Sequence, residues 1–178
     1  MHGNFTHLFF NMFALWMFGK ILENVWGAKR FLIYYMITAL GAAALHLVVS
    51  QYEIMSLQSQ INPNDLNILL ENGRSILEGN QNYTNVLMGK LNLLINTPTV
   101  GASGAVFGIL LAFGMLFPNT LLYIYFAIPI KAKYFVMIYG ALELYLGLSN
   151  NPTDNVAHFA HLGGMLFGYI LLKYWQKN

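Results

Sequence analysis

The sequence lacks cysteine altogether and has few charged residues. Without thiols it has no disulfides and no thiolate metal sites, and it gives no sign of the redox compartment. Charged residues make up 9% of the 178 positions and hydrophobic residues 57%, and the mean hydropathy is +0.51. These values are too apolar for a soluble domain of this length. We therefore expect a protein of the lipid bilayer, and the formal net charge of +2 gives no support for nucleic-acid binding.

Several apolar stretches are long enough to cross the roughly 30 Å hydrocarbon core of a bilayer, which takes about 20 residues. They cover residues 5–26, 31–50, 100–117, 133–149 and 156–175. Glycine or polar residues occur in each, as in helices that pack together inside a membrane. The expected fold is all-α, a polytopic transmembrane helix bundle that forms a single membrane domain over residues 1–178.

Two stretches differ from the apolar segments. Residues 51–97 are rich in Asn, Gln and Glu, and Asn62-Pro63 is a helix-start signal. We expect an extracytoplasmic insertion there, with one or two short amphipathic helices. The aromatic and β-branched stretch from Leu121 to Ile130 is expected to form a loop at the membrane interface.

Basic residues are distributed unevenly between the two faces of the predicted bundle. If the first helix runs inward, the opposite face receives only Arg74 and Lys90, and the cytoplasmic face receives Lys20, Lys29, Arg30, Lys131, Lys133, Lys173 and Lys177. Positive residues collect on the cytoplasmic side of membrane proteins. This distribution predicts the orientation, with a plasma membrane of a prokaryote as the expected location.

Ser103 is a candidate nucleophile, because Gly101 and Gly104 leave room around it for a substrate carbonyl. Pro98 suits the first turn of a helix, which places Ser103 near a helix N-terminus. Free amides and the helix dipole favour a developing negative charge at that position.

His161 is the candidate base, because a serine hydroxyl is a poor nucleophile until a base takes its proton. Gly164 and Gly168 follow His161 on one stripe of the last helix, which would allow this helix to press against the serine helix. No third residue that would orient His161 is evident. A Ser103–His161 dyad is therefore the simpler interpretation.

Other polar residues lie in the apolar segments, where they are costly unless they face a cavity or a partner. His7 and Asn11 share one face of the first helix, where they would supply oxyanion donors or, in a structural role, bond to neighbouring backbone. His46 is expected to be structural. Glu143 should be paired, protonated or facing water, and the sequence does not indicate its partner or its role.

These motifs resemble those of the rhomboid family of intramembrane serine proteases. Glu23, twelve residues after Asn11, also fits the family pattern. The resemblance covers nearly the whole chain outside residues 51–97. It is carried by His2-(4 residues)-His7-(3 residues)-Asn11, Gly101-Ala102-Ser103-Gly104 and His161-(2 residues)-Gly164-(3 residues)-Gly168.

The resemblance implies roles for these residues. Ser103 would be the nucleophile and His161 the general base, while His7, Asn11 and the Ser103 amide would form the oxyanion hole. His2 would hold the loop beside the site, and the helix over 133–149 would gate lateral access of a substrate helix. The substrate would be a transmembrane protein cut near the outer membrane boundary. No cofactor and no metal are implied, and the oligomeric state is not indicated.

The sequence departs from the family pattern in two ways. Phe107 stands where the family frequently has tyrosine; its ring can still pack on the imidazole, but it offers no hydroxyl. The family core has six spanning helices, whereas this sequence begins inside what would be the loop after the first. Five spanning helices are therefore expected here, with the first helix of the six-helix core missing.

Three other functions compete with proteolysis. A catalytically silent rhomboid-like protein would bind or escort membrane helices, although both Ser103 and His161 are present here. A metal-dependent membrane enzyme would use His2, His7, His158 and His161, but no thiolate or His-Glu-x-x-His motif accompanies them. A transporter is compatible with the composition, yet no inverted repeat is visible.

Overall fold

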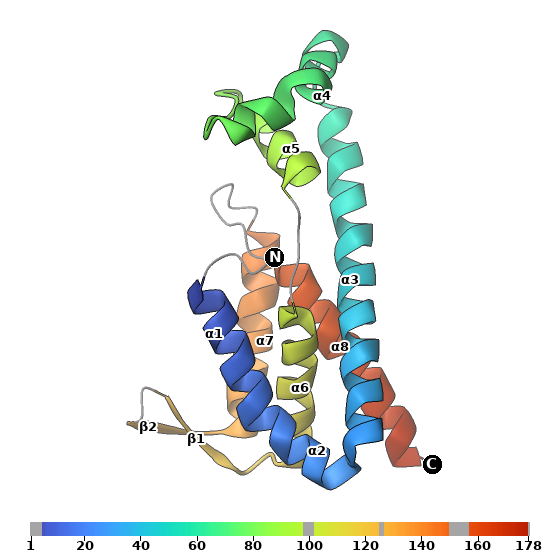
Figure 1. Ribbon diagram of the computed structural model, residues 1–178, viewed down its shortest axis with the longest axis vertical. Coiled ribbons are helices and arrows are strands. Elements are labelled where there is room, and N and C mark those ends of the chain that lie inside the picture. Colours follow the sequence, from blue (N-terminus) through green and yellow to red (C-terminus); the bar gives the residue numbers. More distant parts are fainter. Residues whose placement is uncertain (1–4, 98–101, 125–126, 150–156, 178) are drawn as a thin grey trace. The chain divides into compact units, whose positions relative to one another are not determined.

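A computed structural model of the chain shows a largely helical protein (Figure 1). It describes residues 5–97, 102–124, 127–149 and 157–177. The chain divides into two compact units. We call residues 47–100 the insertion unit, and residues 2–46 together with 101–178 the bundle. Helix α3 contributes to both units, since it belongs to the bundle as far as His46 and to the insertion unit beyond it.

The bundle is built from the helices that come before and after the insertion unit in the sequence. They are α1 (Phe5–Ala14), the π-helical turn η1 (Leu15–Gly19), α2 (Lys20–Trp26), the first part of α3 (Ala28–Gln58), α6 (Ser103–Leu116), α7 (Ala132–Leu148) and α8 (His158–Lys177). The first three form one continuous segment, Phe5–Trp26. Gly27 turns the chain into α3 with φ of +79°, a conformation that side chains other than glycine rarely adopt.

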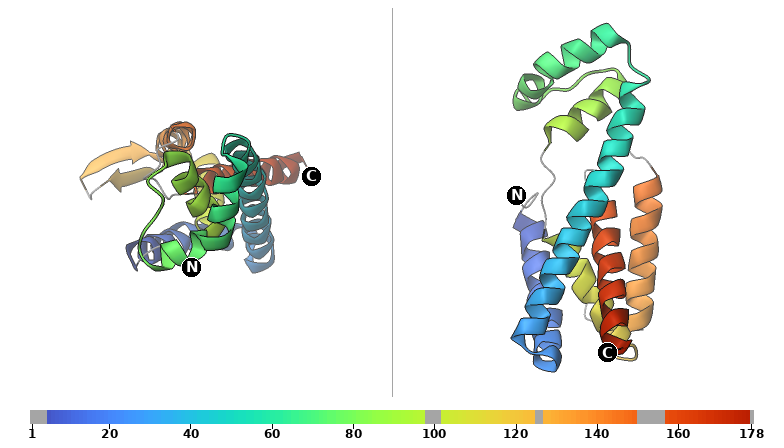
Figure 2. Two further views of the ribbon diagram at one scale, coloured as in Figure 1. Left: turned by 90° about the horizontal axis from the view of Figure 1, so that it is seen from above. Right: turned by 90° about the vertical axis from the view of Figure 1, so that its right-hand side faces the viewer.

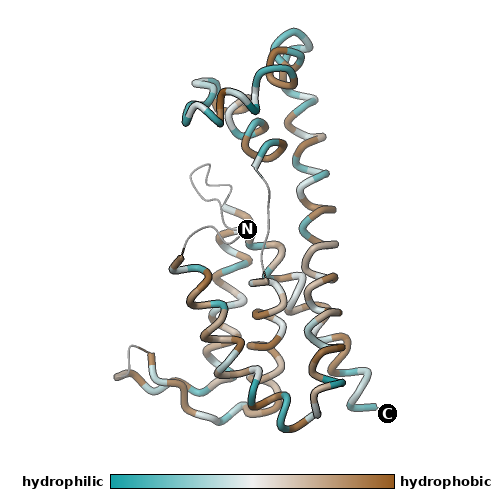
Figure 3. Tube along the Cα trace, in the orientation of Figure 1, coloured by the Kyte–Doolittle hydropathy of each residue, from teal (hydrophilic) through white to brown (hydrophobic). Residues whose placement is uncertain are grey.

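Two helical segments, Phe5–Trp26 and Ala28–Gln58, are long and apolar enough to cross a membrane by length and composition. Apolar residues also dominate the shorter α6 (Figure 3). Large apolar side chains on the outer surface of the bundle are widely exposed, among them Phe9, Trp16 and Leu40. A soluble protein rarely exposes so much apolar surface. The lipid bilayer is the medium that suits it.

The predicted helix boundaries agree well with the structure. The segment 5–26 is reproduced, 133–149 and 156–175 shift by one or two residues, and 100–117 corresponds to α6, with residues 98–101 outside the described part. The segment 31–50 is longer than expected, because α3 continues into polar residues as far as Gln58. The all-α prediction is confirmed.

Helices α3, α6 and α8 pack through small residues. A methyl group added at Gly164 of α8 would overlap the carbonyl oxygen of Gly104 on α6, and one added at Gly108 of α6 would lie 3.0 Å from the carbonyl oxygen of Gly164. Helices α6 and α8 therefore meet backbone to backbone. Gly168 faces α3, where an added methyl would overlap the hydroxyl of Tyr34.

Tyr34 ties α3 to α6 by a hydrogen bond. Its hydroxyl donates to the carbonyl oxygen of Gly108 over 2.8 Å, in a fully buried position. Buried polar groups need such partners, because an unpaired one loses its hydration without compensation. The packing of the three helices is thus specified by both small residues and a buried hydroxyl.

The connection between α6 and α7 contains an antiparallel strand pair, where the sequence predicted an interfacial loop. Strand β1 (Leu121–Ile124) pairs antiparallel with β2 (Ile128–Lys131), with Leu121 opposite Lys131 and Ile124 opposite Ile128. Aromatic and β-branched residues favour extended backbone, which explains the strands. As predicted, the segment is not a membrane span.

Beyond the end of α3, the described part of the insertion unit contains two short helices, within the one or two that the sequence predicted. They are α4 (Pro63–Glu78) and α5 (Val86–Asn96), and Asn62 caps α4 by accepting a hydrogen bond from the amide of Asn64. A small apolar cluster of its own holds the unit together. Its buried members are Leu57, Leu69, Met88 and Leu91.

Candidate functional site

Helices α6 and α8 begin and α7 ends at the same end of the bundle (Figure 1). Helices α7 and α8 lie side by side there (Figure 2). The buried polar residues at this end are Asn11, Ser103, Glu143, His158 and His161. The basic residues Lys20, Lys29, Arg30, Lys131, Lys133, Lys173 and Lys177 belong to α2, to β2 and to the termini of α3, α7 and α8 near the opposite end.

Ser103 is the first residue of α6 and is only 6% exposed. The predicted start of a helix at this serine is confirmed, and amides in a first helical turn have no intrahelical acceptor. The adjacent Gly104 lies against α8, where an added methyl would be 3.0 Å from the carbonyl oxygen of Ala160. Among the described residues, no hydrogen bond joins the Ser103 hydroxyl to His161.

His161 lies in the first turn of α8, one residue after Ala160, and its ring is held on one face by Phe107. The two rings are nearly parallel, with 4.0 Å between their centroids. Phenylalanine at position 107 therefore packs on the imidazole without a hydroxyl group. A second aromatic ring, that of Tyr139 on α7, packs against Phe107.

Glu143 supplies the partner of His161 that the sequence analysis did not find. Its Oε2 atom lies 2.8 Å from Nδ1 of His161 and 2.6 Å from Nδ1 of His158. All three side chains are buried. A carboxylic acid hydroxyl would donate to one nitrogen only, whereas an ionised carboxylate oxygen accepts from both. With Glu143 ionised, Nδ1 of each histidine carries the hydrogen.

His7 and Asn11 share a face of α1, as their spacing predicted. The side-chain amide of Asn11 donates a hydrogen bond to the carbonyl oxygen of His7 over 2.9 Å. Asn11 is buried, and His7 is partly exposed. An asparagine amide carries two hydrogens, so this bond within α1 uses one of them.

The described members of the remaining predicted site residues lie at contacts between helices. His2 and Gly101 lie outside the described residues. Gly104 and Gly164 form the contact between α6 and α8, and Gly168 lies at the contact with α3. The site thus draws on side chains from α1, α6, α7 and α8.

Three of these side chains also form a set with the composition of a metal site. The ligand atoms of Glu143, His158 and His161 lie within 4.8 Å of one another. In the described part of the chain, His7 is not part of such a group, so the four-histidine set considered from the sequence is not assembled there. The two short hydrogen bonds already occupy the carboxylate oxygen.

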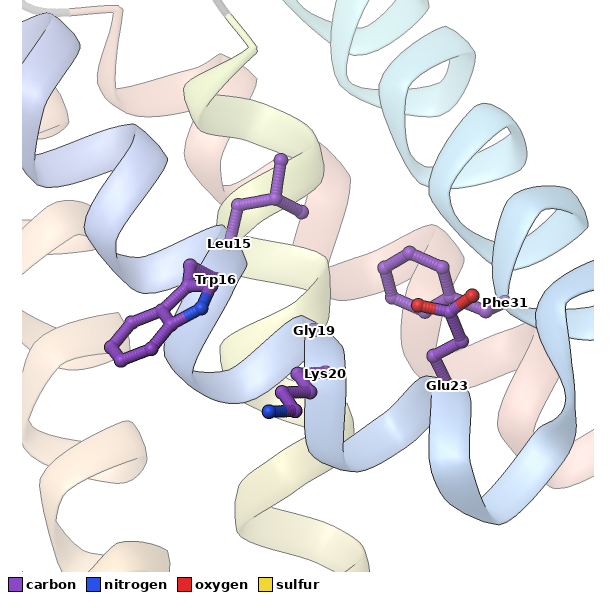
Figure 4. A pocket seen from close by; sticks show the side chains of 6 residues that line it. All are labelled: Leu15, Trp16, Gly19, Lys20, Glu23 and Phe31. Atoms are coloured by element: carbon purple, nitrogen blue, oxygen red, sulfur yellow. The ribbon is translucent and has the colours of Figure 1, made fainter.

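A separate open pocket of about 300 Å³ lies at the π-helical turn (Figure 4). Glu23, the residue that fits the family pattern, lines it, together with Leu15, Trp16, Gly19, Lys20 and Phe31. This pocket is at the far end of the segment Phe5–Trp26 from His7 and Asn11. It does not include any of the candidate catalytic residues.

Comparison with known families gives a match over almost the entire sequence. A rhomboid domain profile matches residues 1–177. The chain belongs to the rhomboid family. A curated relative is a mitochondrial protein of Saccharomyces cerevisiae, rhomboid protein 1, which is 26% identical over 99% of this chain and 40% of its own length. No solved structure shows a significant match.

A second rhomboid relative is an uncharacterized mitochondrial protein of Schizosaccharomyces pombe, 29% identical over 99% of this chain and 50% of its own length. This chain therefore spans half or less of the length of these relatives. Both are mitochondrial, so the predicted location in the plasma membrane of a prokaryote is wrong. Charge asymmetry distinguishes the two faces of a membrane protein but does not identify the membrane.

Proposed function

We propose that this rhomboid protein is an intramembrane serine endopeptidase that cleaves transmembrane proteins near a membrane boundary. Ser103 acts as the nucleophile and His161 as the general base. The observation that carries the proposal is the backbone contact between α6 and α8, which holds the helix of Ser103 against that of His161. Both side chains are buried at the same end of the bundle. The names of the relatives support a mitochondrial membrane as the location.

The reaction follows from these roles. The proton of the Ser103 hydroxyl passes to Nε2 of His161 as Oγ attacks the substrate carbonyl. His161 then gives this proton to the leaving amine, and water hydrolyses the resulting acyl-enzyme in a second step. No cofactor takes part in these steps.

The negative oxygen of the tetrahedral intermediate needs donors that are already oriented. The amide of Ser103, in the first turn of α6, and the second hydrogen of the Asn11 amide are suitable donors. His7 is the third candidate, through its ring. We also propose that His2 supports this side of the site and that the chain, with its insertion unit, acts as a single rhomboid domain.

The direct test is cleavage of a single-span model substrate by the protein in lipid vesicles. We expect Ser103→Ala and His161→Ala to abolish cleavage, and a fluorophosphonate probe to label the wild-type protein but not Ser103→Ala. Ser75→Ala is a matched control, since the exposed Ser75 hydroxyl only donates to the backbone of its own helix. Full cleavage by Ser103→Ala would refute the proposal and favour a protein that binds membrane helices without cutting them.

A further inference from the structure

Glu143 and His158 form a buried pair that the Ser103–His161 chemistry does not by itself require. Glu143 is 5% exposed and His158 is 7% exposed. A carboxylate is costly to bury in a bilayer unless it is paired or hydrogen-bonded. A charged residue within a membrane segment is for this reason a functional-site candidate.

The geometry points to Glu143 as a positioning residue that holds His161 in the form needed for catalysis, with His158 fixing the carboxylate. This inference rests on the proposed function of Ser103 and His161. Oε2 of Glu143 lies 2.8 Å from Nδ1 of His161. An ionised carboxylate can only accept, so with Glu143 ionised this nitrogen carries the hydrogen. In neutral imidazole the other nitrogen, Nε2, is then an acceptor.

An acceptor at Nε2 is what a base for Ser103 requires. During the reaction, Nε2 takes the serine proton and later transfers it to the leaving amine, while the hydrogen on Nδ1 stays in place. His161 carries a positive charge between these two transfers. The carboxylate of Glu143, 2.8 Å from Nδ1, stabilises this charge in a site from which water is largely excluded.

His158 acts on Glu143 and not on the substrate. Its Nδ1 donates to the same oxygen, Oε2, over 2.6 Å. This second bond fixes the carboxylate and helps to keep it ionised inside the bundle. His158 and His161 are three residues apart and share one face of α8, so both are directed toward α7.

The test compares Glu143→Gln and Glu143→Asp in the vesicle cleavage assay. Glutamine keeps the size of the side chain but removes the negative charge, and its amide can donate to Nδ1 and reverse the tautomer. We expect kcat to fall by about 100-fold or more with KM unchanged, because loss of the corresponding carboxylate in a serine protease triad has effects of this order or larger. Aspartate, which keeps the charge, should restore part of the loss.

Two further measurements separate positioning from folding. The rate of fluorophosphonate labelling of Ser103 should fall in Glu143→Gln in proportion to kcat, while the thermal unfolding temperature shows whether the bundle remains intact. Glu53→Gln is the matched control, since Glu53 forms an ion pair with Lys90 in the insertion unit. It should cleave at the wild-type rate.

The failures of the two proposals are distinguishable. If Ser103→Ala is inactive while folded Glu143→Gln cleaves and labels at the wild-type rate, the positioning role is refuted and the protease assignment stands. Loss of wild-type cleavage on chelation, with recovery on addition of Zn²⁺, would also overturn the positioning role. Glu143, His158 and His161 would then each supply one metal ligand.

Discussion

The ring of Phe107 lies flat on the imidazole of His161, with 7° between the two ring planes. The stack limits tilting of the imidazole, and the hydrogen bond to Glu143 limits its rotation. A base has to be held in this way, because small errors in the position of a catalytic group cost much of its effect. The stack needs an aromatic ring at position 107 but no hydroxyl group on it.

Replacing Phe107 by alanine should loosen His161. Stacked aromatic pairs contribute about 0.5–1.5 kcal/mol beyond area burial, so we expect a loss of about tenfold in kcat. Phe107→Tyr should retain activity, since the ring is kept. Steady-state cleavage of a model substrate measures both.

Phe113→Ala is the control for this prediction. Phe113 lies on the same helix, is also buried, and packs on Phe18 with 4.8 Å between ring centroids. It should cost comparable stability but less of kcat. Equal losses of kcat in Phe107→Ala and Phe113→Ala would contradict a specific role for the stack.

Gly164→Ala should force α6 and α8 apart, because the new methyl group would overlap the carbonyl oxygen of Gly104. Overpacking of this kind costs about 1–3 kcal/mol, and the separation should also reduce cleavage. Thermal unfolding in detergent measures the first effect. Gly140→Ala is the control, since its methyl would meet only the flexible end of Met165; equal destabilisation by the two variants would argue against a rigid helix contact.

Asn11→Ala should lower kcat by about 10²–10³-fold, the usual effect of removing one oxyanion donor. KM should change little, because the donor acts on charge that develops during the reaction. Asn72→Ala is a close control. The Asn72 amide also donates to the carbonyl oxygen four residues before it, but on the exposed surface of α4. If both variants cleave at the wild-type rate, Asn11 has only its role within α1.

Asn92→Ala should destabilise the insertion unit by about 1–3 kcal/mol, the cost of leaving a buried polar group unpaired. Asn92 is fully buried, donates to the carbonyl oxygen of Gly73 and to Oδ1 of Asn82, and accepts from Asn96. Limited proteolysis within residues 47–97 should become faster. The exposed Asn67→Ala should leave the digestion rate unchanged, and an unchanged rate in Asn92→Ala would show that this network contributes little.

The sequence predicted the helices and their small-residue contacts because both depend on short-range patterns. Gly164 follows His161 by three residues and so lies on the same face of α8. This spacing predicted that Gly164 would lie where α8 contacts α6, as it does. The strands β1 and β2 were missed because β-branched residues near a membrane surface fit a loop and a strand equally well. The pairing of Leu121–Ile124 with Ile128–Lys131 is a contact between two segments, which the composition of either segment does not indicate.

The partners of Glu143 were missed for a different reason. Glu143 and His161 are 18 residues apart and lie on different helices, and helical periodicity does not indicate which faces of two helices meet. A signal was nevertheless present. His158 and His161 share a face of α8, and Glu143 lies near the end of the preceding helix. If these two consecutive helices are taken to be antiparallel neighbours, Glu143 and the two histidines lie at the same end of the pair and can be in contact.

In the proposed mechanism, the contact between Glu143 and the two histidines also makes the tautomer of His161 depend on the position of a helix. The carboxylate belongs to α7, whereas both imidazoles belong to α8. A displacement of α7 by a few ångströms would break both hydrogen bonds. Glu143 would then no longer hold the hydrogen of His161 on Nδ1. By reciprocity, whatever stabilises the protonated imidazole also draws α7 toward α8. The coupling free energy between the position of α7 and the protonation of His161 is the amount by which the bond to Glu143 is stronger for the protonated imidazole than for the neutral one.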